Sequence, residues 1–274
     1  MSILLKVPAM RYDCYFTSTK GSHHLENEDS VYINDGIIII ADGMGGECCG
    51  EIASSIAVKT MSEVLQEKLY GLSSEPMIGK LLLEATAKAD EAISQYIGLH
   101  RDALGMGTTV LVAILKGCKL YLAWCGDSRC YLYEENEVSL LTKDHSFVQE
   151  LVDAGELGEN EAISHPDSNI ITRFVGGGSD MCRPDFKCLE IPDSTLLILC
   201  SDGLSGYCRK DEIEHVIQNT DDVENLPVTL RELAIRKGSD DDITIVVLRS
   251  ETYPPHPPER SFFTRLKRKI KERF

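Results

Sequence analysis

The chain has 274 residues, of which 43% are apolar and 26% are charged, and its formal net charge is −16. This length and apolar content are enough for one large domain or two small ones with a sizeable core. So acidic a chain repels a phosphate backbone, which argues against nucleic-acid binding, and its charge otherwise indicates only solubility.

The ten cysteines include no Cys-x-x-Cys pair, and the adjacent Cys48 and Cys49 suit neither a zinc site nor a disulfide framework. We expect reduced thiols that mostly fill the core, as in a reducing cytoplasm. No apolar run approaches the ~18 residues of a membrane span, and Lys6 and Pro8 interrupt the first apolar run too early for a signal peptide. The expected location is therefore the cytoplasm.

Two kinds of apolar pattern predict the secondary structure. Helical spacing of apolar residues predicts helices over 51–69, 77–97, 146–154 and 226–236. Apolar, β-branched runs between turn residues predict strands over 30–41, 108–115, 119–124, 129–133, 195–200 and 243–248. Two consecutive helices followed by three close strands disfavour a regular βαβ alternation. Short turns within 111–120 and at Gly126-Asp-Ser128 predict antiparallel meanders, so we expect helices packed on antiparallel sheets.

The chain after the last predicted strand differs from the rest. The predicted globular domain covers residues 1–250, and a stiff, Pro-rich linker over 251–259 follows it. Residues 260–274 carry seven basic side chains and one acidic side chain, a net of +6, which leaves −22 for the rest of the chain. An apolar stripe at helical spacing runs through this tail, formed by Phe262, Leu266, Ile270 and Phe274.

The tail has several interpretations. Its pattern fits docking on a partner protein, on the acidic body of this chain or on an anionic membrane, at the inner membrane surface. A solvated terminus is the alternative.

Two segments 160 positions apart have the same design, and we call them the two Asp-Gly units. They are Ile37-Ile-Ile-Ile-Ala-Asp-Gly-Met-Gly-Gly46 and Leu197-Ile-Leu-Cys-Ser-Asp-Gly-Leu-Ser-Gly206. In each, an apolar strand leads directly into Asp-Gly and a flexible turn. One Asp-Gly alone is most simply a turn, but the paired occurrence at strand ends indicates a site.

Further acids stand at the ends of other predicted strands. Asp241 and Asp242 precede the last strand, so antiparallel pairing can bring either of them near Asp42 and Asp202. Asp127 follows the strand over 119–124. Converging carboxylates are costly to ionise without a cation. Because the pattern offers oxygen ligands and no thiolate or imidazole, it favours Mg²⁺ or Mn²⁺ over Zn²⁺.

At these residues the sequence resembles the bacterial metal-dependent serine/threonine protein phosphatases of type 2C. The matching segments follow the family's order over about residues 10–248 and are Asn27-Glu-Asp29, Ala41-Asp-Gly-Met-Gly-Gly46, Gly105-Met-Gly-Thr-Thr109, Gly126-Asp-Ser-Arg129, Leu151-Val-Asp-Ala-Gly-Glu-Leu157, Ile171-Thr-Arg173, Ser201-Asp-Gly203 and Asp241-Asp-Ile-Thr244. The resemblance implies an α+β fold, a four-layer α-β-β-α sandwich of two antiparallel sheets flanked by helices. It also implies a mobile flap over about 144–178 that borders the site.

The resemblance further implies a binuclear centre of Mn²⁺ or Mg²⁺ in the channel between the sheets. Asp42 would bridge the two ions, the carbonyl of Gly43 would bind one of them, and Asp202 and Asp241 would complete the first. Asp127 would hold a third, weaker ion.

Three more positions near the ions receive roles from the resemblance. Asp29 would orient metal-bound waters, and Glu28 would touch the second ion through water. At the position of the arginine that grips the substrate phosphate in the family, this chain has His24. A loop histidine without a role is the alternative. Asp242 replaces the usual asparagine, which leaves open whether Asp241 or Asp242 is the ligand.

The sequence therefore predicts a phosphoserine/phosphothreonine protein phosphatase that uses a metal-bridging hydroxide as the nucleophile. Its expected partners are phosphorylated proteins, the substrates of a serine/threonine kinase. The alternative is a pseudophosphatase that acts as a binding or regulatory module, although all the metal-binding acids are retained. A hydrolase of small phosphate esters or nucleotides is a third interpretation, but the sequence lacks the phosphate-binding Gly-x-x-x-x-Gly-Lys loop that would support it.

Overall fold

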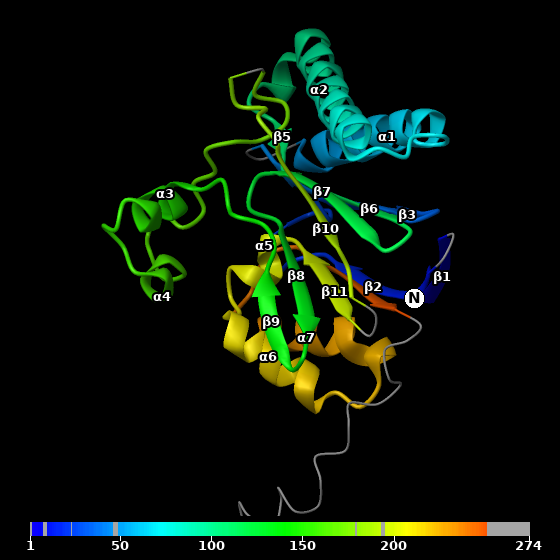
Figure 1. Ribbon diagram of the computed structural model, residues 1–274. Coiled ribbons are helices and arrows are strands. Elements are labelled where there is room, and N and C mark those ends of the chain that lie inside the picture. The colour runs from blue at the N-terminus through cyan, green and yellow to red at the C-terminus, as the bar shows by residue number, and fades with distance from the viewer. Residues whose placement is uncertain are drawn as a thin grey trace, which may run out of the picture.

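Two antiparallel sheets lie face to face in the computed structural model, and helices cover the outer face of each (Figure 1). The structure describes residues 2–7, 10–22, 24–45, 49–178, 180–192 and 195–250. Helices α1 and α2 lie on one side of the paired sheets, and α5, α6 and α7 lie on the other. The predicted α+β class and the four-layer sandwich are therefore confirmed.

Each sheet is antiparallel throughout. The first, called here the β12 sheet, contains in spatial order β1 (Ser2–Val7), β2 (Met10–Thr19), β12 (Ile243–Ser250), β11 (Leu196–Cys200), β8 (Arg129–Glu134) and β9 (Glu137–Leu140). The second, called the β4 sheet, contains β10 (Asp185–Glu190), β7 (Lys119–Cys125), β6 (Val110–Lys116), β4 (Ile37–Met44) and β3 (Asp29–Asn34), with the short β5 (Gly107–Thr108) paired to β4.

The helices fall into three groups. The pair on the β4 sheet is α1 (Gly50–Lys68) and α2 (Glu75–Leu99). The group on the β12 sheet is α5 (Asp202–Ser205), α6 (Lys210–Asn219) and α7 (Leu226–Arg236). The two short helices α3 (Phe147–Asp153) and α4 (Glu159–Ala162) stand away from the sandwich (Figure 1). They belong to residues 144–178, which we call the flap segment.

Strand β4 shows why its sequence is a continuous apolar run. Ile37 and Ile39 pack into the core under α1 and α2, whereas Ile38 and Ile40 pack into the core between the two sheets. Because successive residues of a strand point to opposite faces, a strand buried on both faces has no polar position. Burial on both sides holds the carboxyl end of β4, with Asp42, in a fixed place.

Two of the predicted strand features differ from the observed ones. The predicted strand over 30–41 is a hairpin, because Asp35 and Gly36 both have positive φ angles and turn the chain between β3 and β4. The meander predicted at Gly126-Asp-Ser128 is wrong. Strands β7 and β8 belong to different sheets, so this turn crosses from one sheet to the other. The hairpin predicted within 111–120 is confirmed.

The remaining sequence predictions concern the C-terminal segments, membrane-spanning helices and the cysteines. The linker over 251–259 and the basic tail over 260–274 lie outside the described residues. No helix among the described residues has the length and apolar character needed to cross a bilayer. Disulfides are absent among the nine cysteines that the structure describes, and most of these side chains are buried.

Candidate metal centre

Four predicted acids meet at one end of the sandwich. Asp42 lies near the end of β4, and Asp202 is the first residue of α5, directly after β11. Asp241 lies in the turn before β12, and Asp127 lies in the turn between β7 and β8. Asp42 comes from one sheet and Asp202 from the other, so the face-to-face packing of the sheets is what brings the two Asp-Gly units together.

The electrostatics of Asp42 show how closely the acids gather. Burial raises the pKa of the Asp42 carboxyl well above its usual range, and the charges of Asp202, Asp29, Asp241 and Asp127 raise it further. All four neighbours therefore lie within electrostatic reach of one carboxyl group.

The other acids of the cluster are shifted in the same direction. Burial, followed by the charge of Asp202, raises the pKa of Asp241 to about 6. Burial also raises the pKa of Asp202, although a hydrogen bond with Asp42 opposes that rise. For Asp127, burial and the Asp202 charge raise the pKa well above the usual range. The protein alone thus holds these groups in a place where their ionisation is costly.

Three carboxylate oxygens of the cluster have no hydrogen-bond partner among the described residues. They are the buried Oδ1 atoms of Asp29, Asp127 and Asp202. A buried carboxylate oxygen without a donor is costly unless a cation satisfies it. Unsatisfied oxygens and mutual repulsion are both relieved by a divalent ion, so the residues fit a metal centre.

The donor set indicates which class of metal fits. The acids offer only hard oxygen atoms, which suit Mg²⁺ and Mn²⁺. Cys200 is the nearest sulfur in sequence to Asp202, and burial raises the pKa of its thiol to about 12. It therefore stays a neutral thiol in the core of the β12 sheet, where thiolate ligation is disfavoured.

Gly43 and Asp29 adjoin Asp42 on the β4 sheet. Gly43 has no room for a side chain, because an added Cβ would overlap the carbonyl oxygen of Gly50 at the start of α1. Asp29 is paired directly opposite Asp42 in the β3–β4 ladder, and its Oδ2 accepts a hydrogen bond of 2.8 Å from Ser201 Oγ. Asp29 thus bridges the two sheets beside Asp42 and Asp202, and its predicted role of orienting metal-bound waters stays a prediction.

Glu28 lies on the other side of Gly43. Its backbone oxygen accepts a hydrogen bond from the Gly43 N–H, and its carboxylate lies so close to Gly50 that an added Cβ there would overlap Oε2. Burial raises the pKa of this carboxyl. The Glu28 carboxylate therefore lies against the start of α1 at Gly50, and its predicted contact with the second ion through water stays a prediction.

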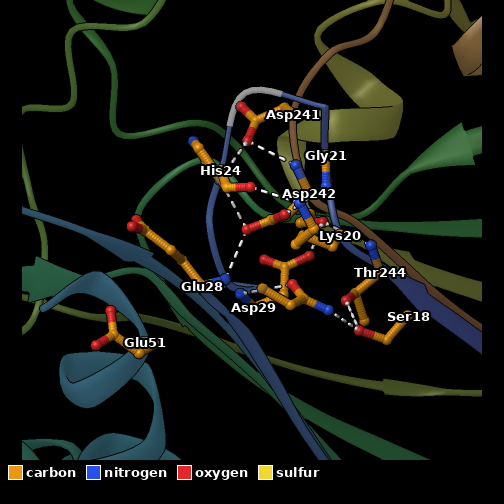
Figure 2. A network of polar contacts seen from close by, with 12 residues as sticks. Ser18, Lys20, Gly21, His24, Glu28, Asp29, Glu51, Asp241, Asp242 and Thr244 are labelled. Atoms are coloured by element: carbon orange, nitrogen blue, oxygen red, sulfur yellow. Dashed lines mark hydrogen bonds and ion pairs between the residues drawn. The ribbon is translucent and has the colours of Figure 1, made fainter. Parts of the chain in front are cut away.

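Asp242 has a role of its own, and Figure 2 shows its carboxylate among three donors. Oδ1 accepts the N–H of Gly21 at 2.6 Å, while Oδ2 accepts the N–H of Glu28 at 2.6 Å and faces His24 Nδ1 at 2.9 Å. Both oxygens are thus used to hold the loop over residues 21–28. Asp241 Oδ1 accepts the N–H of Asp242 at 2.7 Å, so fewer donors engage the Asp241 carboxylate within the part of the chain that the structure describes, and the geometry favours Asp241 over Asp242 as the ligand.

His24 is placed by this contact. Its ring nitrogen Nδ1 is bonded to Asp242 and lies 3.9 Å from Asp241 Oδ1. The hydrogen bond with Asp242 raises the pKa of His24. His24, Asp241 and Asp242 also place ligand atoms within 4.8 Å of one another, although Asp242 is already engaged by backbone donors. His24 is therefore part of the acidic end of the sandwich, and its contact with a phosphate stays a prediction.

A large cavity opens beside the acids. Its volume is about 1080 Å³, and Asp127, Asp202 and Asp241 are among its lining residues. Further lining residues come from α3 and α4 of the flap segment and from the start of α6. The cavity therefore adjoins both the acids and the flap segment, and it has room for a substrate larger than a phosphate group.

Sequence reasoning assigned no role to three side chains that support the site. Thr109 Oγ1 accepts the N–H of Asp42 at 3.1 Å and forms a hydrogen bond of 2.9 Å with Ser128 Oγ, next to Asp127. Arg129 forms an ion pair of 2.7 Å with Asp144 at the start of the flap segment. His145 contacts the turn before Asp127. Thr109 and Arg129 belong to segments that resemble the family. Their hydrogen-bond partners are determined by tertiary structure, so the spacing of residues along the sequence could not predict them.

Comparison with known proteins identifies the family of this arrangement. The family model described as protein phosphatase 2C matches residues 5–151, more than half of the chain. The serine/threonine phosphatase stp of Listeria monocytogenes is 32% identical over 232 residues, which cover 84% of this chain and 91% of that protein. The chain belongs to the protein phosphatase 2C family.

Other members of the protein phosphatase 2C family agree in sequence and fold. The serine/threonine protein phosphatase PstP of Mycobacterium tuberculosis is 35% identical over 231 residues, 84% of this chain but 43% of PstP, so the chain spans less than half of that relative. The crystal structure of the M. tuberculosis phosphatase PstP/Ppp has a TM-score of 0.79 at 33% identity, covering 87% of this chain and 98% of that one. The PstP catalytic domain in complex with two manganese ions has a TM-score of 0.75 at 30% identity, covering 87% and 98%.

Proposed function

We propose that this member of the protein phosphatase 2C family is a metal-dependent enzyme that removes phosphate from phosphoserine and phosphothreonine in proteins. The observation that carries the proposal is the cluster of Asp42, Asp127, Asp202 and Asp241 between the sheets, with its unsatisfied buried oxygens. The related phosphatases named above agree with it, and nothing among them favours the pseudophosphatase alternative.

The metal assignment follows the donor set. Asp42 would bridge two Mn²⁺ or Mg²⁺ ions, with Asp202, Asp241 and the Gly43 carbonyl as further ligands and Asp127 at a third, weaker ion. When bound, such ions activate water as a nucleophile and neutralise charge on the phosphoryl group. Manganese is favoured as the test ion, because the PstP catalytic domain was described with two manganese ions.

The protein's own part in the reaction is to hold the acids at fixed positions. The Asp42 N–H is held by Thr109 Oγ1, and its carbonyl oxygen accepts hydrogen bonds of 2.8 Å from Thr108 Oγ1 and Thr109 N. Ser201 accepts the N–H of Thr244 at 3.0 Å and donates to Asp29. These bonds connect β4 to β5 and β11 to β12, so they hold Asp42 and Asp29 in place beside the other acids.

The cavity has room for a substrate larger than a phosphate group. Pockets for drug-sized ligands are on the order of 300–1,000 Å³, and the cavity beside the acids reaches about 1080 Å³. A phosphoryl group at Asp127 and Asp202 would occupy only part of the cavity, which leaves the rest for neighbouring peptide residues. We therefore propose phosphoproteins made by a serine/threonine kinase as substrates, in a signalling role in the cytoplasm.

The direct test measures hydrolysis of a phosphothreonine peptide and of an aryl phosphate by the full chain, with and without Mn²⁺. We expect metal-dependent activity on the peptide that Asp202→Asn abolishes. The matched control is Asp35→Asn, an exposed turn residue with a φ of 47° that asparagine tolerates well. Activity that needs no metal, or that survives Asp202→Asn, would overturn the proposal.

A further inference from the structure

The turn that carries Asp127 is held by one residue of the flap segment. Gly126 N–H donates to His145 Nδ1 at 3.1 Å, and Gly126 C=O accepts the N–H of His145 at 3.0 Å. Gly126 has a φ of 120°, and an added Cβ would lie 2.6 Å from the Thr109 side chain. Residues other than glycine would be strained in this backbone conformation. The two hydrogen bonds with His145 therefore hold a turn that depends on glycine at position 126.

The contacts of His145 determine which ring nitrogen carries the proton. Since Nδ1 accepts the Gly126 N–H, the proton of the neutral ring must be on Nε2. Burial, with the charge of Arg173, lowers the pKa of His145, so the ring is neutral near pH 7. His145 is 2% exposed, and Nε2 lies 3.4 Å from Asp185 Oδ2, a distance beyond a well-formed hydrogen bond.

Asp185 is itself held in place from the end of the flap segment. It lies in β10, and Arg173 Nη1 donates to its Oδ1 at 2.9 Å. The His145 ring also stacks on Trp124, with 6.2 Å between the ring centroids and 17° between the planes. The ring is thus fixed on one face by β7 and at its Nε2 edge by β10.

The chain at the beginning of the flap segment is also bonded to β7 and to the end of the flap segment. Trp124 Nε1 donates to the carbonyl oxygen of Lys143 at 2.8 Å, and the carbonyl of His145 accepts the N–H of Thr172 at 2.8 Å. The two ends of the flap segment are therefore joined to each other and to the strand that leads into Asp127.

We propose that His145, as its Nε2–H tautomer, is a positioning residue that sets the Gly126–Asp127 turn for the third ion, with Asp185 and Arg173 orienting the ring. The proposal rests on the proposed function, because Asp127 is the acid assigned there to the weakest ion. Groups that orient metal ligands typically change metal affinity about 10–100-fold when they are removed. The chain of contacts also connects the two ends of the flap segment to the metal centre.

The two edges of the ring can be tested separately. Asparagine places its amide oxygen near the position of Nδ1, so His145→Asn retains an acceptor for the Gly126 N–H and loses the Nε2 edge. Glutamine places its amide nitrogen near the position of Nε2, so His145→Gln retains a donor toward Asp185 and loses the Nδ1 acceptor. His165→Gln is the matched control, since His165 also lies in the flap segment and its ring bonds within its own turn, where Nδ1 accepts the N–H of Asp167.

The experiment titrates the full chain with Mn²⁺ by calorimetry and follows phosphopeptide hydrolysis against Mn²⁺ concentration. For His145→Gln we expect the affinity for the weakest ion to fall about 10-fold or more. The affinities for the two more tightly bound ions and the melting temperature should stay nearly unchanged. His145→Asn should keep binding within about threefold of wild type, and His165→Gln should change nothing.

The outcomes separate this proposal from the proposed function. Wild type that binds three ions without hydrolysing the peptide contradicts the function alone. Equal binding by His145→Gln and wild type, an equal loss in His145→Asn and His145→Gln, or a wild type that binds fewer than three ions overturns the positioning role. If His145→Gln does not fold, Asp185→Ala replaces it. Without Asp185 the ring can carry its proton on Nδ1 and lose the acceptor for the Gly126 N–H, so a severalfold weaker third ion is then the supporting result, and unchanged binding is the opposing one.

Discussion

The two Asp-Gly units are alike in sequence and are supported differently in the structure. Asp42 stays within β4, and its backbone bonds to Thr108 and Thr109 on the neighbouring chain segment. Asp202 comes after its strand has ended, and the segment before β12 supports its unit, because Ser239 Oγ donates to the Gly203 carbonyl at 2.9 Å. One acid is thus fixed by a strand ladder and the other by a helix start and a loop.

Despite this difference, both units require glycine after the aspartate for the same physical reason. An added Cβ on Gly43 would overlap the carbonyl of Gly50, and one on Gly203 would overlap the carbonyl of Asp242. In both units the backbone of another segment approaches too closely for a side chain. The repeated dipeptide therefore combines a ligand with a close backbone contact, and a turn alone would not require both.

The largest expected effect tests whether the two acids are equivalent in the reaction. Asp42→Asn and Asp202→Asn should each lower kcat for a phosphopeptide about 1000-fold or more, equal to about 4 kcal/mol of transition-state stabilisation. Each should also abolish much of the rise in melting temperature that Mn²⁺ causes in the wild type. If one variant keeps near-normal kcat while the other is inactive, the two units do not share one metal centre.

The next effect concerns the loop that supports the second unit. Asp242→Asn replaces an acceptor of three hydrogen bonds, so we expect the free energy of unfolding to fall by about 2–4 kcal/mol without metal. Asp241→Asn makes the same chemical change one position earlier and should cost much less, because its carboxylate is repelled by its neighbours. Denaturant unfolding of both metal-free variants measures the difference.

For Asp241→Asn and Asp242→Asn, the expected losses of Mn²⁺ stabilisation have the opposite order to the losses of metal-free stability. Asp241→Asn should lose more of the Mn²⁺-induced rise in melting temperature than Asp242→Asn. Equal stability of the two metal-free variants would contradict the supporting role given to Asp242, and a larger metal defect in Asp242→Asn would exchange their assignments.

A smaller effect tests the close backbone contacts. Gly43→Ala and Gly203→Ala should each destabilise the fold by about 1–3 kcal/mol, because the added methyl group forces two backbones apart. Gly98→Ala is the control, since this glycine lies in α2 with no atom within 4 Å of an added Cβ. It should be stabilising by about 0.5–1 kcal/mol. Thermal unfolding that shows no difference among the three variants would remove the explanation given for both glycines.

The features that the sequence predicted correctly are those with a strong local pattern of apolar and polar residues. The helices over 51–69 and 77–97 were predicted to within two residues of α1 and α2, because each is long and has a regular apolar face. The acid at each strand end was also predictable, since it follows an abrupt change from apolar to polar residues. The site's chemistry is thus carried by local patterns.

The remaining features depend on contacts between distant segments. Strands β2 and β10 were not predicted, because polar and charged residues interrupt the apolar pattern in both. The separation of β7 and β8 into two sheets depends on tertiary packing and not on the turn at Asp127. The bonds that Asp242 accepts come from residues more than two hundred positions away, a relation that no spacing rule contains.

The smallest expected effect tests the departure at His24, beside the second unit. His24→Arg should lower KM for a phosphopeptide a few-fold, because a guanidinium is always charged and offers two parallel donors to a phosphate. The gain is limited, since His24 Nδ1 already bonds to Asp242 and arginine must replace this contact. His215→Arg on the exposed side of α6 adds the same charge away from the cavity, and it should leave KM unchanged.

A second substitution at the same position separates phosphate binding from loop support. His24→Asn keeps an amide group near the position of Nδ1, where it can donate to Asp242, and removes the other edge of the ring. If that edge meets the phosphate, KM rises in His24→Asn while the melting temperature stays close to wild type. If His24 serves only Asp242 and the loop over 21–28, KM is unchanged in both variants. A change in KM would therefore assign phosphate contact to the loop side of the centre.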